Sequence, residues 1–352
     1  MGLFEAAGRA TLVGSMPHRD PERAVSVVLE TMTDIPVWPQ LPKYPAEQMM
    51  VQYLEGLPGV RHEEGRVWVD TAGSEEEILS FYEDYLAAEA SPSFLDLSRF
   101  AMGEETGRTF RLFVSRLSSE PDRWAAVKGQ IVGPFTVLSG LTDPHRRALL
   151  FDDRFRDVVV KHLSMKAVWQ VRQLSRWQKP VILFLDEPAL AGFGTSAYIT
   201  VSAEDVKALL TEVAEPIRRA GALVGVHVCA NTDWGLLFEC PVDIINFDAY
   251  LYFDRFALYR ERCFEFWDRG GIVAWGMVPT SDEDAIDGVS AEQLAERWKE
   301  QVEALCGDKR STDDVLRRSL MTPSCGCGTL SEAHAERVAA VTRDLSRLLR
   351  GN

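Results

Sequence analysis

The chain has 352 residues, enough for one (β/α)8 barrel or two smaller domains, and its 46% hydrophobic and 26% charged residues are typical of a globular protein. A formal net charge of −15 argues against a nucleic-acid partner, because such binding generally needs clustered Lys and Arg. No apolar run approaches the length of a membrane span, and the stretch 1–17 lacks a basic region followed by an apolar core. We therefore expect a cytoplasmic protein without a membrane partner.

Short apolar or β-branched runs recur along the chain and predict eight strands, at 10–17, 35–42, 124–134, 180–188, 222–230, 241–250, 270–279 and 317–326. Stretches of helical length separate several of them. Helix starts are marked by Ser202 with Asp205 and by Ser290 with Gln293, and Gly221 stands where a left-handed helix end is expected. Apolar strands that alternate with helices predict a parallel sheet covered on both faces. Eight such units predict a closed α/β barrel, the TIM barrel.

The main alternative fold is a doubly wound open sheet. Its first turn usually carries GxGxxG, whereas this chain reads VGSMPHRD after the first run. The segment from about 56 to 120 is too long for a simple connection; GVRHEEGRVWVD within it predicts a hairpin, and the rest is helical. We expect this segment to be an excursion after the second strand, so that 1–352 forms a single catalytic domain.

Polar side chains follow the predicted strands, and in such barrels the active site lies at the strands' carboxyl ends. The candidates that we expect at one mouth are Ser15, Asp186, Glu187, His227, Cys229, Asp248 and Cys325. His18, in the first loop, is a further candidate for lining this mouth.

A zinc site is the chemistry that these residue types favour. In a strand, residues i and i+2 point to one face, so His227 and Cys229 present an imidazole and a thiol side by side. Zinc takes four ligands from thiolate, imidazole and carboxylate groups, and Cys325, with Asp248 or an exchangeable group, would complete the set. Cys327 competes with Cys325 as a ligand. The other cysteines are interpreted as structural: Cys240, Cys263 and Cys306.

Several stretches together resemble a known family: LVGSMP, GPFTVLSG, FLDEPAL, GVHVCANTDW, IINFDAY and TPSCGCGTLSEAHAERV. They are similar to the catalytic barrel of the cobalamin-independent methionine synthases. HVCANT is also similar to the methylcobamide:coenzyme M methyltransferases of the same superfamily, which includes uroporphyrinogen decarboxylase. The resemblance covers almost the whole chain and corresponds to the core form, without the additional N-terminal half of the full-length synthases.

The resemblance implies zinc-dependent methyl transfer to a thiol. The family's zinc ligands match His227, Cys229, Asp248 and Cys325, although the full-length enzymes have Glu where Asp248 stands. A thiol bound to zinc is deprotonated, and the thiolate is the nucleophile.

The resemblance also assigns substrate-binding residues. The family's Gly-Ser turn, which holds the homocysteine carboxylate, matches Gly14 and Ser15, and its Asp-Glu-Pro motif matches Asp186 and Glu187, with the Asp binding the substrate amine. A second amine-binding Glu has no aligned counterpart; Glu47 is nearby. The predicted acceptor is a small thiol, homocysteine first, with coenzyme M left open.

Two departures concern the methyl donor. A Trp that stacks on the folate is replaced within TVLSGL (136–141), and the loop WGMVPTSDEDA lacks the family's proton-transferring His. Loss of a methyl group from folate N5 requires a general acid, whereas loss from cobalt leaves Co(I) and needs no proton. We therefore expect a methylated corrinoid donor, either methylcobalamin or a corrinoid carrier protein.

Three rival interpretations remain open. A uroporphyrinogen-decarboxylase-like lyase needs no metal and an Arg-rich first loop, but only Arg9 and Arg19 flank this one. A corrinoid carrier would use an Asp-x-His-x-x-Gly loop, and no His of this chain has that setting. A purely structural zinc would take four protein ligands, with Cys327 as the fourth.

Overall fold

A computed structural model describes residues 4–63, 65–120 and 122–351. Its centre is a parallel seven-stranded sheet in the order β1-β9-β8-β7-β6-β5-β4. The strands are β1 (Arg9–Ala10), β4 (Val127–Val132), β5 (Val181–Asp186), β6 (Leu223–Val228), β7 (Ile244–Phe247), β8 (Ile272–Val278) and β9 (Ser319–Pro323). Strands β4 to β9 lie within the predicted runs, and their residues are almost all buried. The α/β class with a parallel sheet is therefore confirmed.

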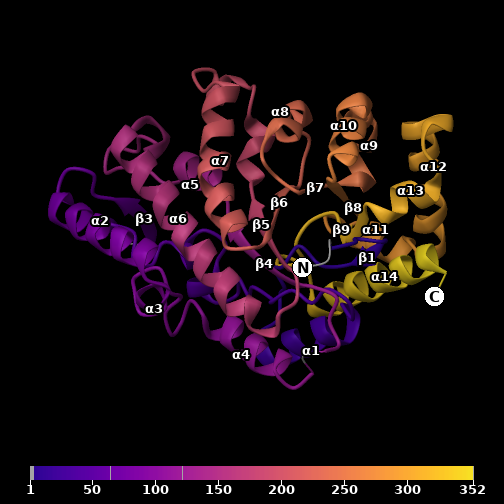
Figure 1. Ribbon diagram of the computed structural model, residues 1–352, viewed down its shortest axis with the longest axis horizontal. Coiled ribbons are helices and arrows are strands. Elements are labelled where there is room, and N and C mark those ends of the chain that lie inside the picture. The colour runs from indigo at the N-terminus through magenta and orange to yellow at the C-terminus, as the bar shows by residue number, and fades with distance from the viewer. Residues whose placement is uncertain (1–3, 64, 121, 352) are drawn as a thin grey trace.

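Helices lie around the sheet and connect successive strands (Figure 1). They are α1 (Pro21–Thr31), α5 (Pro134–Gly140), α6 (Asp153–Leu174), α7 (Ala203–Arg219), α8 (Trp234–Glu239), α9 (Ala249–Ala257), α10 (Arg260–Asp268), α11 (Glu283–Gly288), α12 (Ala291–Cys306), α13 (Thr312–Arg317) and α14 (Glu332–Arg350). The predicted start signals of α7 and α12 are confirmed, since Ser202 with Asp205 and Ser290 with Gln293 form capping boxes. Gly221, after α7, has φ of 91°.

The predicted strand at 35–42, the second in chain order, is the main correction to the fold. Within the described residues this segment makes only isolated parallel bridges, Ser15 to Gln40 on one side and Val37 to Lys128 on the other. The cause is local, because Pro36, Pro39 and Pro42 lack the N–H groups that a ladder requires. The segment thus touches both edges of the curled sheet, but a closed eight-stranded ladder is not formed in the described chain.

The excursion has the predicted hairpin, β2 (Val60–Glu63) with β3 (Arg66–Val69), and the helices α2 (Glu75–Ala90), α3 (Pro92–Leu95) and α4 (Arg108–Leu117). Helices α2 and α3 lie at one end of the molecule, far from α12 and the C-terminus (Figure 1). One apolar cluster includes Phe81 of the excursion and Leu185 of β5. The division of the chain into domains stays a prediction. Among the helices of the described residues, none combines the length and apolar character needed to cross a bilayer.

Candidate metal and substrate site

A cavity of about 250 Å³ lies where the predicted site residues meet. It is lined by Val13, Ser15, Gln40, Pro42, Met49, Asp186, Pro188, His227, Cys229, Cys325, Gly326, Gly328 and Thr329. These residues follow or end β1, β5, β6 and β9, together with the proline-rich segment 35–42 and its continuation. The carboxyl ends of parallel strands therefore build this cavity.

Three potential metal ligands converge in the cavity. The ligand atoms of His227, Cys229 and Cys325 all lie within 4.8 Å of one another. His227 and Cys229 come from β6 and the residue after it, two positions apart, and Cys325 comes from the turn after β9. The predicted convergence of an imidazole and two thiols is thus present in the geometry.

The imidazole of His227 is oriented by a buried amide. Its Nδ1 lies 2.6 Å from Oδ1 of Asn246, and the Asn246 Nδ2 donates to the Ala274 carbonyl and to the Thr322 hydroxyl, each at 2.9 Å. Because that amide oxygen must accept, Nδ1 carries the proton. The buried Nε2 has no hydrogen-bond partner among the described residues. An imidazole with an unpartnered Nε2 beside two thiols is a donor set that fits zinc.

The two thiols differ in their pKa. The neighbouring thiol of Cys325 and the imidazole of His227 hold the pKa of Cys229 well below its usual range. The same contact with Cys229, together with burial, raises the pKa of Cys325. Of the two thiols, Cys229 is therefore the one whose surroundings favour the thiolate. Such a thiolate is both a nucleophile and a ligand for a soft metal ion.

The turn that carries Cys325 is held against Ser15. The Ser15 carbonyl accepts from the Cys327 N–H at 2.8 Å, and the Ser15 hydroxyl accepts from the Gly328 N–H at 3.3 Å. A Cβ atom on Gly326 would lie 2.0 Å from the Ser15 Oγ. Glycine at 326 therefore permits the close approach with the Ser15 hydroxyl in its present orientation. The thiol of Cys327 is buried and does not belong to the three-residue ligand group.

Asp186 is the acidic side chain that lines the cavity. Its buried Oδ1 has no hydrogen-bond partner among the described residues. Burial raises the pKa of this carboxyl to about 6, and the neighbouring His227 and Lys128 oppose this shift. An unpartnered carboxylate oxygen in a small cavity is suited to bind an ammonium group.

Glu187 and His18 do not belong to the cavity wall. Glu187 is next to Asp186, so it points to the opposite face, and it accepts from the N–H groups of Phe135 and Thr136 at 2.9 and 2.8 Å. It thereby holds the start of α5. His18 is fully buried with its Nε2 3.3 Å from Oε1 of Glu336. Their predicted contact with substrate stays a prediction.

Asp248 and Gly14 stand next to the cavity. Asp248 follows β7 as Cys229 follows the neighbouring strand β6. Its Oδ1 accepts from the Leu251 N–H at 2.8 Å, so that Asp248 caps the N-terminus of α9. Its carboxylate is outside the group of ligand atoms within 4.8 Å of one another. Burial raises its pKa to about 6. Gly14 has φ of 148°, and a Cβ there would lie 2.7 Å from the side chain of Gln130.

The sequence interpretation missed Gln40, Met49 and Asn246. Gln40 and Met49 line the cavity from a segment whose irregular backbone gives no periodic signal. Asn246 is two residues before Asp248 and therefore on the same face of β7, a signal that was available in IINFDAY.

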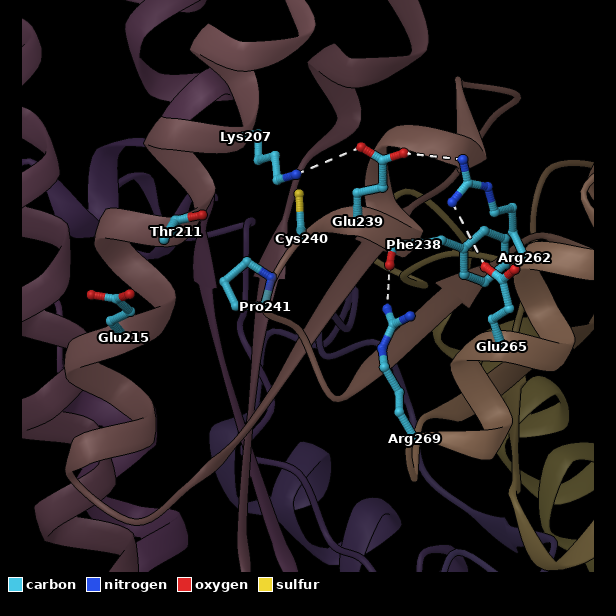
Figure 2. A pocket seen from close by; sticks show the side chains of 10 residues that line it. All are labelled: Lys207, Thr211, Glu215, Phe238, Glu239, Cys240, Pro241, Arg262, Glu265 and Arg269. Atoms are coloured by element: carbon cyan, nitrogen blue, oxygen red, sulfur yellow. Dashed lines mark hydrogen bonds and ion pairs between the residues drawn. The ribbon is translucent and has the colours of Figure 1, made fainter.

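A larger groove, of about 580 Å³, lies on the outer flank between α7, α8 and α10 (Figure 2). Its positive side chains have partners within the groove. Lys207 and Arg262 lie 3.6 and 3.4 Å from the carboxylate of Glu239, and Arg269 donates to the Phe238 carbonyl. No predicted site residue lines this groove.

Comparisons with known proteins support the fold only. No protein-family model matches the chain, and no curated protein matches it. A structure of a B12-independent methionine synthase from Shewanella sp. W3-18-1, in complex with selenomethionine, is similar with a TM-score of 0.55 and 14% identity, over 97% of this chain and 97% of that one. A pneumococcal exo-β-D-N-acetylglucosaminidase has a TM-score of 0.48 at 9% identity, over 97% of this chain and 85% of that chain, and we draw nothing from it.

Proposed function

We propose that this chain is a zinc-dependent methyltransferase that methylates the sulfur of a small thiol, homocysteine first, to give methionine. The observation that carries the proposal is the unpartnered Nε2 of His227, which shares a cavity with two cysteines and an unpartnered carboxylate oxygen of Asp186. A methionine synthase of similar fold, with selenomethionine bound, supports the same assignment.

His227, Cys229 and Cys325 would hold the metal. Bound zinc lowers the pKa of a coordinated thiol and fixes its sulfur for attack on a methyl group. Catalytic zinc sites typically have three protein ligands and one exchangeable position, whereas structural sites have four. A set of three, with the thiol of Cys327 outside it, supports a catalytic role. Asp248 stays a candidate for the fourth position before the thiol enters.

The charges around the cavity support an amino-acid thiol as the methyl acceptor. No Lys or Arg lines the cavity, and Asp186 offers an oxygen to an ammonium group. The carboxylate of homocysteine would contact the Ser15 hydroxyl and the glycine turn after β9. Coenzyme M has a sulfonate and no amine, so it would leave the Asp186 carboxylate buried and unpaired, which is costly.

The donor that we propose is a methylated corrinoid, free or on a carrier protein. Apart from the three metal-binding candidates, Asp186 is the acidic group of the cavity wall, and in this proposal it is ionised and occupied by the amine. No lining group is left to protonate a folate nitrogen. With a corrinoid, the carbon–cobalt bond breaks as the carbon–sulfur bond forms, and the electron pair stays on cobalt.

A methyl-transfer assay tests this proposal. Zinc-loaded protein is offered methylcobalamin or methyltetrahydrofolate, each with homocysteine or with coenzyme M. We expect cob(I)alamin and methionine from methylcobalamin with homocysteine. Turnover of the folate would overturn the donor, and turnover with coenzyme M alone would overturn the acceptor. Absence of turnover with every pair, in protein that holds zinc, would contradict methyl transfer from these donors.

A further inference from the structure

A buried lysine lies inside the sheet below the candidate site. Lys128 of β4 is fully buried, and its Nζ donates to the Val13 carbonyl at 2.7 Å and lies 4.3 Å from the ring centroid of Phe184. The ammonium therefore contacts a carbonyl and an aromatic ring rather than a carboxylate. Burial of an ammonium without an ion pair costs free energy, so a position that keeps one calls for a compensating role.

The carbonyl that Lys128 holds belongs to the substrate turn. Val13 lines the cavity and comes directly before Gly14 and Ser15. Regular pairing of β1 ends at Ala10, so no strand ladder holds this stretch. Main-chain hydrogen bonds still hold the turn, since the Gln40 N–H donates to the Gly14 carbonyl at 3.0 Å and the Met16 N–H donates to the Gln40 carbonyl at 2.8 Å. Lys128 adds a side-chain hydrogen bond at the Val13 carbonyl.

The next inward side chain of β4, that of Gln130, also donates a hydrogen bond to a main-chain carbonyl, here one in the segment 35–42. Gln130 lies against Gly14, and its Nε2 donates to the Trp38 carbonyl at 3.0 Å. Trp38 belongs to the proline-rich segment that makes only isolated bridges. Side chains of β4 therefore add to the isolated main-chain bridges where the ladder is interrupted, and Lys128 is the charged member of this pair.

The charge of Lys128 also suits the cavity above it. Burial lowers the pKa of Lys128 to about 7, and the negative charge of Asp186 opposes this shift. Among the described residues, no Lys or Arg side chain lines the cavity itself. A carboxylate that binds near Ser15 would have the Lys128 ammonium behind the Val13–Ser15 turn, in a region of low dielectric where charges interact strongly.

We propose that Lys128 is a positioning residue of the substrate site, which fixes the Val13–Ser15 turn and supplies the positive charge for the acceptor's carboxylate. The part that concerns the acceptor rests on the proposed function. The part that concerns the turn does not. Lys128 acts through the turn and is not itself in contact with the cavity.

The chain offers a matched control. Lys166 of α6 is also fully buried, its Nζ also contacts a single carbonyl, that of Ala101 at 3.4 Å, and it does not line the cavity. Lys128→Met and Lys166→Met thus remove the same group from equally buried positions. Lys128→Gln is the third variant, because an amide can still donate to the Val13 carbonyl but carries no charge.

Two readouts are measured on the zinc-loaded full chain. The first is amide hydrogen exchange of the segment 11–17. The second is the KM for homocysteine, compared with the KM for 3-aminopropane-1-thiol, which lacks the carboxylate. We expect Lys128→Met to speed exchange in 11–17 and to raise the KM for homocysteine by about tenfold or more, with little change for the aminothiol. Lys128→Gln should keep the protection and still raise the KM for homocysteine.

Equal behaviour of Lys128→Met and Lys166→Met in both readouts would overturn the proposal, because it would reduce Lys128 to an ordinary buried residue. An equal rise of KM for both thiols would overturn the charge role. If the wild-type chain methylates no thiol, the proposed function fails on its own, and hydrogen exchange of 11–17 still decides whether Lys128 holds the turn.

Discussion

Two hollows of the molecule, the flank groove and the cavity at the strand ends, differ in size and in chemistry. The flank groove of about 580 Å³ is the larger, but its Lys and Arg side chains are paired with groups of the groove itself (Figure 2). The cavity at the strand ends is about 250 Å³, yet it contains an imidazole nitrogen and a carboxylate oxygen without partners. Buried polar groups are normally satisfied, and these two unpartnered atoms share one cavity in which a single ligand could satisfy both.

The cysteines of the two hollows show the same contrast. Burial raises the pKa of Cys240, in the groove, to about 12, and its thiol donates to the Leu236 carbonyl at 3.3 Å. Cys229, in the cavity, has its pKa lowered by Cys325 and His227. Only the second environment favours a thiolate, which is the reactive and metal-binding form.

The largest effect that we predict comes from replacing the cysteine of the cavity, with the cysteine of the groove as its control. Cys229→Ser should abolish stoichiometric zinc binding and lower methyl transfer by more than about 100-fold, because it removes a direct ligand. Cys240→Ser should retain zinc and activity. Zinc content by mass spectrometry and the methyl-transfer assay check both. If Cys229→Ser keeps its zinc, the ligand assignment is wrong.

The next effect concerns the amide that orients His227. Asn246→Ala should weaken zinc binding by about 10–100-fold, since partners that orient a metal-binding histidine typically contribute this much. Competition with a chelator of known affinity measures the change. Glu265→Ala, in the groove, is the control and should leave zinc affinity unchanged. An Asn246→Ala protein with wild-type affinity would show that the Nδ1 contact does not tune the site.

A smaller effect, on the KM for homocysteine and not on zinc binding, is expected when the carboxylate of Asp186 is removed. Asp186→Asn should raise the KM for homocysteine by about tenfold with zinc content preserved, because the ammonium loses its charged partner. Glu239→Gln removes a carboxylate from the groove and should leave KM within about twofold. A loss of zinc in Asp186→Asn would instead identify Asp186 as a metal ligand.

The smallest effect should come from the groove charges. Lys207→Gln breaks a half-exposed ion pair with Glu239 and should change the free energy of unfolding by less than about 0.5 kcal/mol. Denaturant unfolding measures it, and activity should not change. A clear loss of activity would mean that the groove contributes to function and that the contrast between the two hollows fails.

The elements β4 to β9 could be predicted because they are apolar runs with clear boundaries, and the His-x-Cys pair could be predicted because strand periodicity places both side chains on one face. The same periodicity predicts that Glu187 turns away from the face of Asp186. The prolines at 36, 39 and 42 likewise predict the interrupted ladder. These two signals were present in the sequence but were outweighed by the pattern of eight runs and by the resemblance.

Other features had no sequence signal. Lys128 stands in an apolar run, and lysine is rarely fully buried, so nothing in the sequence indicates that its ammonium lies under the substrate turn. The side chain of Asp248 starts α9 rather than joining the three-residue ligand group, and the choice between the two roles depends on the position of α9. Long-range placement of this kind requires the fold.

Zinc K-edge X-ray absorption of the zinc-loaded protein, recorded with and without homocysteine, tests the central claim most directly. The account predicts two sulfur ligands in the free protein, from Cys229 and Cys325, and three after homocysteine is added. An unchanged sulfur count in the presence of homocysteine, or four protein ligands in both spectra, would contradict a catalytic zinc site with an open position for the thiol.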